Sequence, residues 1–201
     1  MDILKKLFAN HPLILASNSP RRQALFRAIG LDFSVYLHDI EEVFSADLAP
    51  HEIVTSLAFQ KAQSVAQAFE HGCIVSADTI VVLGNTILGK PEHEADAEQM
   101  LLQLSGKTHQ VFTGYTVYLK PEDKHLSEFE QTSVTFHQLT REEIRSYIAT
   151  KSPLDKAGSY GIQDAGAVFV KKIDGCFYNV MGFPLAHFYQ TCRTFLQKKG
   201  R

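Results

Sequence analysis

Short apolar runs alternate with amphipathic stretches along the chain, and together they predict a mixture of strands and helices. The run Leu13–Ala16, which follows a proline, is typical of a short buried strand. Ile74–Leu83 is a longer run rich in β-branched residues, but the polar positions 76–79 interrupt it, which predicts a bend or an end of the strand near Asp78. Gly84-Asn85 then indicates a hairpin turn. Further strands are expected at 33–37, at 111–119 and 128–136 on either side of a turn at 121–123, and at 167–173 and 177–180 on either side of a hairpin at 174–175.

Helical periodicity and capping residues predict the helices. Ser19 before Pro20 is typical of an N-cap followed by proline at the first helical position, and Gly30 closes this helix. Between residues 50 and 69, apolar side chains recur at the spacing of one helical face. Residues 140–143 have the spacing of a capping box, which opens another helix. Helices are also expected at 95–104 and from Pro184 onward.

Because strands and helices mix without strict alternation, the expected fold is α/β, with a mixed central sheet and flanking helices. The composition, 45% hydrophobic and 21% charged residues, is ordinary for a globular protein. No repeat, low-complexity tract or linker interrupts the sequence, so a single domain is predicted over residues 1–201.

The charge balance and the apolar runs argue against nucleic-acid and membrane partners. Twenty Lys and Arg residues against 22 Asp and Glu give a formal charge of −2, which provides no field that would attract nucleic acid or an anionic membrane. No apolar run reaches the length that spans a bilayer, and residues 1–8 are a poor secretory signal. The three cysteines are expected to be buried, reduced thiols of a cytoplasmic protein. Phosphate groups would therefore have to be bound by cations placed locally.

The segment Ser17–Arg22 lies on a predicted strand-to-helix turn and combines small hydroxyl residues with two arginines. A helix start offers unpaired backbone N–H groups and a partial positive charge, which together attract anions. The forked donors of Arg21 and Arg22 match phosphate oxygens. The segment is therefore a candidate phosphate site, although a plain capped helix with solvated arginines would have the same sequence.

The candidate acids are an aspartate and a pair of glutamates. A carboxylate such as Asp78 inside an apolar run is costly unless it is paired, hydrogen-bonded or bound to a metal, which favours a chemical role over that of a structural aspartate in a turn. Glu41 and Glu42, next to Asp39, are hard ligands of the kind that suits Mg²⁺ or Mn²⁺. A solvated acidic loop would look the same in the sequence.

Further polar residues occupy positions from which they could reach a nucleotide. Lys61 lies on the apolar stripe of the helix predicted over 50–69, where it either extends to solvent or points into a polar cleft. Lys90, between a glycine and a proline, could present its ammonium group to a phosphate. Gln163 lies in a glycine-containing loop, 152–164, and its amide could read the edge of a base. Each of these residues would also be ordinary on a surface.

Taken together, these segments resemble the Maf family of nucleotide pyrophosphatases. The matching stretches are 15–22, 76–79, 89–91, 104–109, 156–163 and 179–185, so the resemblance extends over about residues 12–188. It implies an α/β fold similar to the inosine-triphosphate pyrophosphatases, with two lobes around a substrate cleft. It also implies hydrolysis of a nucleoside triphosphate to the monophosphate and pyrophosphate, with a divalent metal cation (Mg²⁺ or Mn²⁺) as cofactor. A homodimer is compatible with this resemblance.

The resemblance gives each candidate residue a role. It makes Asp78 the acid that activates water, and it assigns Glu42 and Glu41 to the metal. The residues that match phosphate-handling positions are Ser17, Arg21, Arg22, Lys61 and Lys90, and those that match positions linked to substrate choice are Arg21, Thr79 and Gln163. The loop 160–163 is similar to the branch that acts on dTTP and UTP, with modified pyrimidine nucleotides as further candidates.

Two alternative functions would use the same residues. A nucleotide-binding regulator of cell division would bind without turnover, in line with the association of the family with arrest of septum formation. An inosine or xanthosine triphosphatase would prefer purines. Asp78 and Glu42 favour an enzyme over a regulator that only binds.

Overall fold

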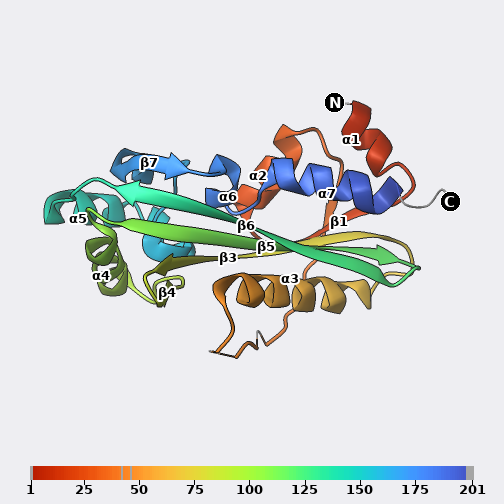
Figure 1. Ribbon diagram of the computed structural model, residues 1–201, viewed down its shortest axis with the longest axis horizontal. Helices are drawn as coiled ribbons and strands as arrows, with labels where there is room; N and C mark the ends of the chain where they lie inside the picture. Colours follow the sequence, from red (N-terminus) through yellow and green to blue (C-terminus); the bar gives the residue numbers. More distant parts are fainter. Residues whose placement is uncertain (1, 42, 46, 198–201) are drawn as a thin grey trace. The chain divides into compact units, whose positions relative to one another are not determined.

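The computed structural model describes residues 2–41, 43–45 and 47–197 (Figure 1). The chain forms two compact units, each built from several segments. Unit 1 comprises Met1–Asp78, Thr113–Glu130 and Gly182–Arg201, and unit 2 comprises Thr79–Phe112 and Gln131–Met181. The expectation of one domain without a separable linker stays a prediction.

Helices and strands follow one another irregularly along the chain. The α-helices are α1 (Asp2–Leu7), α2 (Pro20–Ala28), α3 (Pro50–Ala66), α4 (Glu94–Leu104), α5 (Arg141–Ala149), α6 (Phe177–Val180) and α7 (Leu185–Gln197). The strands are β1 (Leu13–Ala16), β2 (Ser34–Val35), β3 (Gly72–Leu83), β4 (Thr86–Leu88), β5 (Thr108–Lys120), β6 (Lys124–Phe136) and β7 (Val170–Asp174). Between α5 and β7 lie the short 3-10 helices η1 (Ser152–Asp155), η2 (Ala157–Ser159) and η3 (Ala165–Phe169).

The strands form a mixed sheet in the order β2-β1-β3-β5-β6-β7, with β4 paired to β3. β1 is parallel to both β2 and β3, whereas β4 is antiparallel to β3 and β7 is antiparallel to β6. Within unit 1, α3 covers one face of the sheet, and α2 and α7 lie on the other face (Figure 1). The predicted α/β fold with a mixed central sheet and flanking helices is therefore confirmed.

The core of unit 1 has apolar layers beneath its helices. Ile14 and Ile74 of neighbouring strands pack against Ala62 of α3. The fully buried Phe26 of α2 contacts Phe188 of α7, with 5.7 Å between the ring centroids. Burial of such side chains contributes roughly 1.5–3 kcal/mol each, which holds the helices on the sheet.

α3 approaches β5 so closely that a side chain is excluded at Gly114. A Cβ atom at Gly114 would lie 2.4 Å from the carbonyl carbon and 2.5 Å from the carbonyl oxygen of Val54 in α3. These are backbone atoms, which cannot rotate away as the end of a side chain can. The glycine therefore sets the depth at which α3 sits on the sheet, and with it the position of the side chains that α3 turns toward the strands.

The core of unit 2 includes part of the segment that the sequence predicts as a loop. Leu101 of α4, Ile144 of α5 and Phe136 of β6 belong to one buried cluster. Tyr160 and Ile162 belong to the same cluster. The loop predicted over 152–164 is therefore anchored in the core and is not simply a surface loop.

The predicted strand at 177–180 is wrong, because these residues form α6. Gly175 has φ +129°, and no hairpin forms there. Instead, the side chain of Thr132 in β6 bonds to the backbone of Cys176. Its Oγ1 accepts a hydrogen bond from the backbone N–H of Cys176 at 3.0 Å and donates to the Cys176 carbonyl at 3.2 Å. Nδ2 of the buried Asn179 also donates to Thr132 Oγ1 at 2.9 Å. These side-chain bonds replace the strand pairing that a hairpin would supply.

A strand end near Asp78 is also wrong, because β3 runs without a break from Gly72 to Leu83, while the alternative of a bend there stays a prediction. Ser76 and Asp78 have partners on α3, as described below, so the strand does not need to end there to hydrate them. Smaller differences are that α3 ends at Ala66 rather than 69, that β2 is limited to Ser34–Val35, and that α1 has no counterpart in the sequence prediction. Cys73 and Cys192 are buried free thiols as expected, whereas Cys176 is only half-buried.

Candidate functional site

Ser17 and Ser19 shape the turn between β1 and α2. The buried hydroxyl of Ser17 accepts hydrogen bonds from the backbone N–H of Ser19 and from Nη1 of Arg22, each at 3.3 Å. Ser19 is the N-cap of α2, and its Oγ accepts from the backbone N–H of Arg22 at 3.5 Å. Nε of Arg22 donates to the carbonyl oxygen of Gly182 at 2.8 Å. Arg22 thus ties the turn to the segment that leads into α7.

The start of α2 is electrostatically unusual for a helix. Arg21 and Arg22 occupy its first turn, where the helix dipole disfavours cations. The first turn of α2, which the structure describes in full, contains no acidic residue. The two guanidinium groups add positive charge to the partial positive charge of the helix start. The turn is therefore suited to a phosphate group, which the backbone N–H groups of a helix start also favour.

Ser76 and Asp78 lie on one face of β3, and both bond to α3. Oγ of the buried Ser76 donates to the carbonyl oxygen of Ala58 at 2.5 Å. One turn further along α3, Nζ of Lys61 donates to Oδ1 of Asp78 at 2.6 Å. Residues i and i+3 of a helix share a face, as do residues i and i+2 of a strand, so the two bonds are successive links between α3 and β3. The Ser76 bond sets the register in which Lys61 meets Asp78.

The Lys61–Asp78 pair is sheltered but not closed off, since the side chains are 21% and 16% exposed. The ion pair offsets the cost of placing a carboxylate in an apolar strand. Lys61 therefore bonds to a polar partner, and whether it faces a substrate cleft stays a prediction.

The strand register brings the turn after β1 and Asp78 to the same end of the sheet. β1 and β3 are parallel, and Ala16 pairs with Ser76. Ser17 follows Ala16 at the carboxyl end of β1, and Asp78 follows Ser76 by two positions on the neighbouring strand. Ligands of open α/β sheets bind beyond the carboxyl ends of parallel strands. The anion-suited helix start and the paired acid are therefore neighbours within unit 1.

The remaining substrate-binding candidates belong to unit 2. Thr79, the residue after the paired acid in β3, is half-buried. Lys90 is exposed and follows β4, and Gln163 is exposed next to the buried Ile162. Whether these three side chains contact the same ligand as Asp78 stays a prediction.

Carboxylates suited to a divalent metal are sparse. Across residues 2–41, 43–45 and 47–197, no group of three or more His, Cys, Asp or Glu side chains is arranged to hold a metal ion. Glu41 is exposed, and Glu42 lies outside the described residues. Mg²⁺, however, is usually held by one or two carboxylates together with substrate phosphates and waters. The partly sheltered carboxylate of Asp78 fits that smaller requirement.

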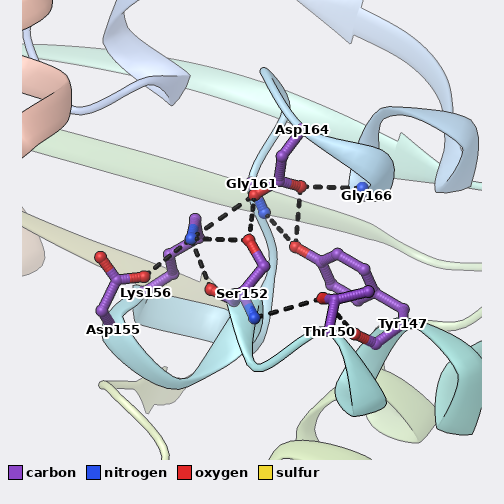
Figure 2. A network of polar contacts seen from close by, with 8 residues as sticks. All are labelled: Tyr147, Thr150, Ser152, Asp155, Lys156, Gly161, Asp164 and Gly166. Carbon is purple, nitrogen blue, oxygen red and sulfur yellow. Dashed lines mark hydrogen bonds and ion pairs between the residues drawn. The ribbon is translucent and has the colours of Figure 1, made fainter.

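Unit 2 contains a second polar network, which the sequence did not reveal (Figure 2). Asp164 accepts hydrogen bonds from the hydroxyls of Tyr147 and Ser152 and from the backbone N–H of Gly166, and it is paired with the buried Lys156. Burial alone would raise the pKa of Asp164, but these hydrogen bonds and the charge of Lys156 together lower it. The available signal was a lysine and an aspartate at the two ends of the glycine-containing segment 156–164.

His109 and Tyr160 form a buried, uncharged pair in the same unit. Nε2 of His109 lies 2.8 Å from the hydroxyl oxygen of Tyr160, and both rings contact Phe136. Burial lowers the pKa of His109 to about 4 and raises the pKa of Tyr160. Both side chains are therefore neutral near pH 7, which suits an anchor for the segment after Tyr160 better than a proton-transfer group.

Comparison with known proteins finds relatives along almost the whole chain. The family model described as Maf-like protein matches residues 12–195. A protein of Bacillus cereus named dTTP/UTP pyrophosphatase is 48% identical over 183 residues, which cover 91% of this chain and 95% of the relative. A protein of the same name from Bacillus cytotoxicus is 49% identical over 182 residues, which cover 90% and 94%.

Similarity to solved structures is more distant. The Ham1 protein of Staphylococcus aureus matches with a TM-score of 0.46 and 17% identity, over 62% of this chain and 71% of that protein. A HAM1 protein from Coxiella burnetii matches with a TM-score of 0.47 and 16% identity, over 63% and 73%. Separately, no helix in the described part of the chain has the length and apolar character that a membrane crossing requires.

Proposed function

Since the chain belongs to the Maf-like proteins, we propose that it hydrolyses dTTP and UTP to the nucleoside monophosphate and pyrophosphate. The observation that carries the proposal is the ion pair between Lys61 of α3 and Asp78 of β3, which neighbours the anion-suited start of α2. The names of relatives at 48% and 49% identity supply the substrate class. Modified pyrimidine triphosphates fall within the same proposal.

In the proposed reaction, Asp78 accepts a proton from the attacking water. The water oxygen forms a bond to the α-phosphorus, and the anhydride bond between the α- and β-phosphates breaks. Pyrophosphate leaves with the electron pair of that bond. Lys61 donates to Oδ1 of Asp78 at 2.6 Å, and the remaining lone pairs of the carboxylate would accept the proton of the water. General-base assistance of this kind contributes ~10²–10⁴-fold to the rate.

The start of α2 is assigned to the phosphates. Its backbone N–H groups and the guanidinium of Arg21 would donate to phosphate oxygens. Arg22 has a divided role, because its bonds to Ser17 and Gly182 build the turn that the phosphates would occupy. From the family resemblance, Lys90 is assigned to the phosphates, and Thr79 and Gln163 are assigned to the choice of base.

A divalent cation, Mg²⁺ or Mn²⁺, completes the proposal. When bound, it neutralises charge on the phosphate oxygens. Asp78 would hold it together with the substrate oxygens, and Glu41 and Glu42 are the further ligands that the resemblance suggests. A homodimer of this chain also stays a prediction.

The proposed function is tested by incubating the purified chain with Mg²⁺ and a panel of nucleoside triphosphates and identifying the products by chromatography. We expect dTMP from dTTP and UMP from UTP, each with one pyrophosphate, and no product after chelation with EDTA. Nucleoside diphosphate and orthophosphate would refute the cleavage site. Binding without any product would support a nucleotide-dependent regulator instead.

A further inference from the structure

We propose that Asp164 is a positioning residue, which fixes the backbone that carries Gln163 and thereby sets the preference among nucleotide bases. This inference rests on the proposed function, in which Gln163 reads the base. Gln163 is exposed and therefore available to a ligand, whereas the side chain of Asp164 turns into the polar network of Figure 2. In this proposal Gln163 contacts the base, and the adjacent Asp164 holds the backbone of Gln163 in place.

The carboxylate of Asp164 is held by donors on both of its oxygens. Oδ1 accepts from the Tyr147 hydroxyl at 2.9 Å and from the backbone N–H of Gly166 at 2.8 Å. Oδ2 accepts from the Ser152 hydroxyl at 2.7 Å. The donors come from α5, from η1 and from the start of η3, so one side chain joins three separate elements. A carboxylate held in this way cannot rotate without breaking several bonds at once.

Lys156 closes the network from the other side. Its side chain is only 9% exposed, and Nζ lies 3.4 Å from Oδ2 of Asp164. Nζ also donates to the carbonyl oxygen of Ser152 and to Oδ1 of Asp155, the latter at 2.7 Å. A buried ammonium requires a paired anion, and removal of one partner of such a pair is more costly than removal of a surface charge. Lys156 therefore adds an electrostatic attraction to the hydrogen bonds that hold Asp164, although Asp155 lies closer to Nζ.

Glycines leave the space that this network fills. A Cβ atom at Gly161 would lie 2.3 Å from Oδ2 of Asp164 and 2.7 Å from Cε of Lys156. A Cβ atom at Gly166 would lie 2.9 Å from the hydroxyl oxygen of Tyr147. The backbone N–H of Gly161 in turn donates to that same oxygen at 2.9 Å. The glycines on both sides of Gln163 thus allow the backbone to approach the network directly.

The opposite end of the segment is fixed independently. Tyr160 is buried against Phe136 and bonded to His109, as described above. The chain between Tyr160 and Asp164 is consequently pinned at both ends, and Gln163 is its exposed residue. Preorganisation of this kind matters because a recognition group that is about 1 Å out of place loses much of its discrimination.

The inference is tested by a double-mutant cycle with Asp164→Asn and Gln163→Ala, assayed with dTTP, UTP and ATP. For Asp164→Asn we expect KM for dTTP and UTP to rise about tenfold, as for the loss of one well-placed hydrogen bond, with kcat changed less than about threefold. KM for ATP should change less than about twofold. In the Gln163→Ala background, Asp164→Asn should add less than about twofold, because it acts through a side chain that is already gone.

Asp174→Asn is the matched control. Asp174 forms a pair with Lys172 at the same 3.4 Å distance, but both side chains are well exposed, at 77% and 67%. Asp174→Asn removes the same charge from unit 2 as Asp164→Asn, and the KM values of this control should stay at the wild-type level. Ser152→Ala is the milder variant in case Asp164→Asn does not fold, since it removes one bond to Asp164 and leaves the ion pair in place. It should shift KM in the same direction and speed amide hydrogen exchange at residues 160–166.

Distinct outcomes separate this inference from the function on which it rests. If the wild-type chain releases no monophosphate from any triphosphate, the proposed function fails and the inference is overturned with it. If the wild type is active but the two substitutions are additive, only the positioning role is overturned. An equal loss for dTTP, UTP and ATP in Asp164→Asn would overturn it in the same way, because a merely structural role predicts no change in base preference.

Discussion

The two units each contain a lysine–aspartate pair, and the two pairs differ in their surroundings. Lys61 and Asp78 are 2.6 Å apart, with side chains 21% and 16% exposed. Lys156 and Asp164 are 3.4 Å apart, with side chains 9% and 24% exposed. Within the residues that the structure describes, Lys61 alone bonds to the Asp78 carboxylate, whereas three further groups donate to Asp164.

The difference shows how one pair of residue types serves two purposes. A carboxylate whose oxygens are filled by donors cannot take a proton or a metal without breaking those bonds, and its removal leaves buried donors unsatisfied. A carboxylate with one donor keeps lone pairs for a water molecule or a ligand. Asp78 is therefore suited to chemistry and Asp164 to support, so substitutions at the two positions should have separable effects on turnover and on stability.

The largest effect is expected for Asp78→Asn. The amide has the shape of the carboxylate but cannot act as a base, so turnover of dTTP should fall by ~10²–10⁴-fold. The free energy of unfolding should fall by about 1 kcal/mol or less, because the lost ion pair is partly solvated. Pyrophosphate release and urea denaturation, measured on one preparation, check both statements.

Asp123→Asn is the control for this substitution. Asp123 is paired with Lys120 at 2.8 Å, but its side chain is exposed, so turnover should stay at the wild-type level. Wild-type turnover in Asp78→Asn would remove Asp78 from the mechanism. A large loss of stability in Asp78→Asn would instead show that Asp78 supports the fold as Asp164 does, and the distinction between the two pairs would fail.

The next effect in size is expected for Arg21→Ala. Loss of one charged hydrogen bond to a phosphate, ~1.5–3 kcal/mol, should lower kcat/KM for dTTP about ten- to 150-fold. Arg27→Ala removes the same charge from the opposite end of α2 and should change kcat/KM less than about twofold, since a cation there is remote from the helix start. Equal losses in the two variants would show that the start of α2 has no special role for the triphosphate.

Gly114→Ala should act on the pair in unit 1 through packing. The new Cβ would meet the backbone of Val54, so the free energy of unfolding should fall by about 3 kcal/mol, and the shift of α3 should move Lys61 away from Asp78. Gly89→Ala is the control, because no atom beyond its two chain neighbours lies within 4 Å of the Cβ position there, and the free energy of unfolding should change by about 0.5 kcal/mol or less. Urea denaturation compares the two. Full stability in Gly114→Ala would mean that α3 is not held at this depth.

The smallest effect concerns the pH dependence of stability, which His109 should dominate between pH 7 and pH 5. Its pKa is about 4 in the folded protein against an ordinary value of 6.5, so the unfolded chain binds more protons below pH 6.5. Stability is therefore complete above that pH and is lost as the pH falls toward 4, by about 2 kcal/mol between pH 7 and pH 5. The pKa of Asp164 is lowered from 3.8, so its own contribution is lost only at lower pH.

Urea midpoints at pH 7 and pH 5 test this prediction. His109→Gln keeps a hydrogen-bonding side chain near Tyr160 but has no titrating ring, so its loss of stability over this range should be about 2 kcal/mol smaller than that of the wild type. The same pH dependence in both proteins would contradict the assignment of His109 as a buried neutral anchor.

Local signals in the sequence were sufficient for much of the fold. The Ser19 cap, the capping box at Thr140 and the hairpin at Gly84-Asn85 are all confirmed, because each depends on residues within one turn or loop. The strand predicted at 177–180 was wrong because the side chain of Thr132, 44 positions away, bonds to the backbone of Cys176. No local pattern contains such a contact.

The site was predictable only as a set of residue types. The sequence singled out Lys61 and Asp78 separately, but the bond between them depends on how α3 lies on β3. The network of Asp164 was missed because its partners Tyr147 and Ser152 are 17 and 12 positions away and belong to other elements. The roles of Glu41 and Glu42 as metal ligands stay predictions, and Glu42 lies outside the described residues.

The central claim, that Asp78 faces a triphosphate bound at the start of α2, is tested most directly by a crystal structure with a dTTP analogue whose α–β bridging oxygen is replaced by NH. We predict that phosphate oxygens accept hydrogen bonds from the backbone of residues 17–22 and that the α-phosphorus lies opposite the carboxylate of Asp78. A nucleotide bound with its phosphates away from both the helix start and Asp78 would contradict the account.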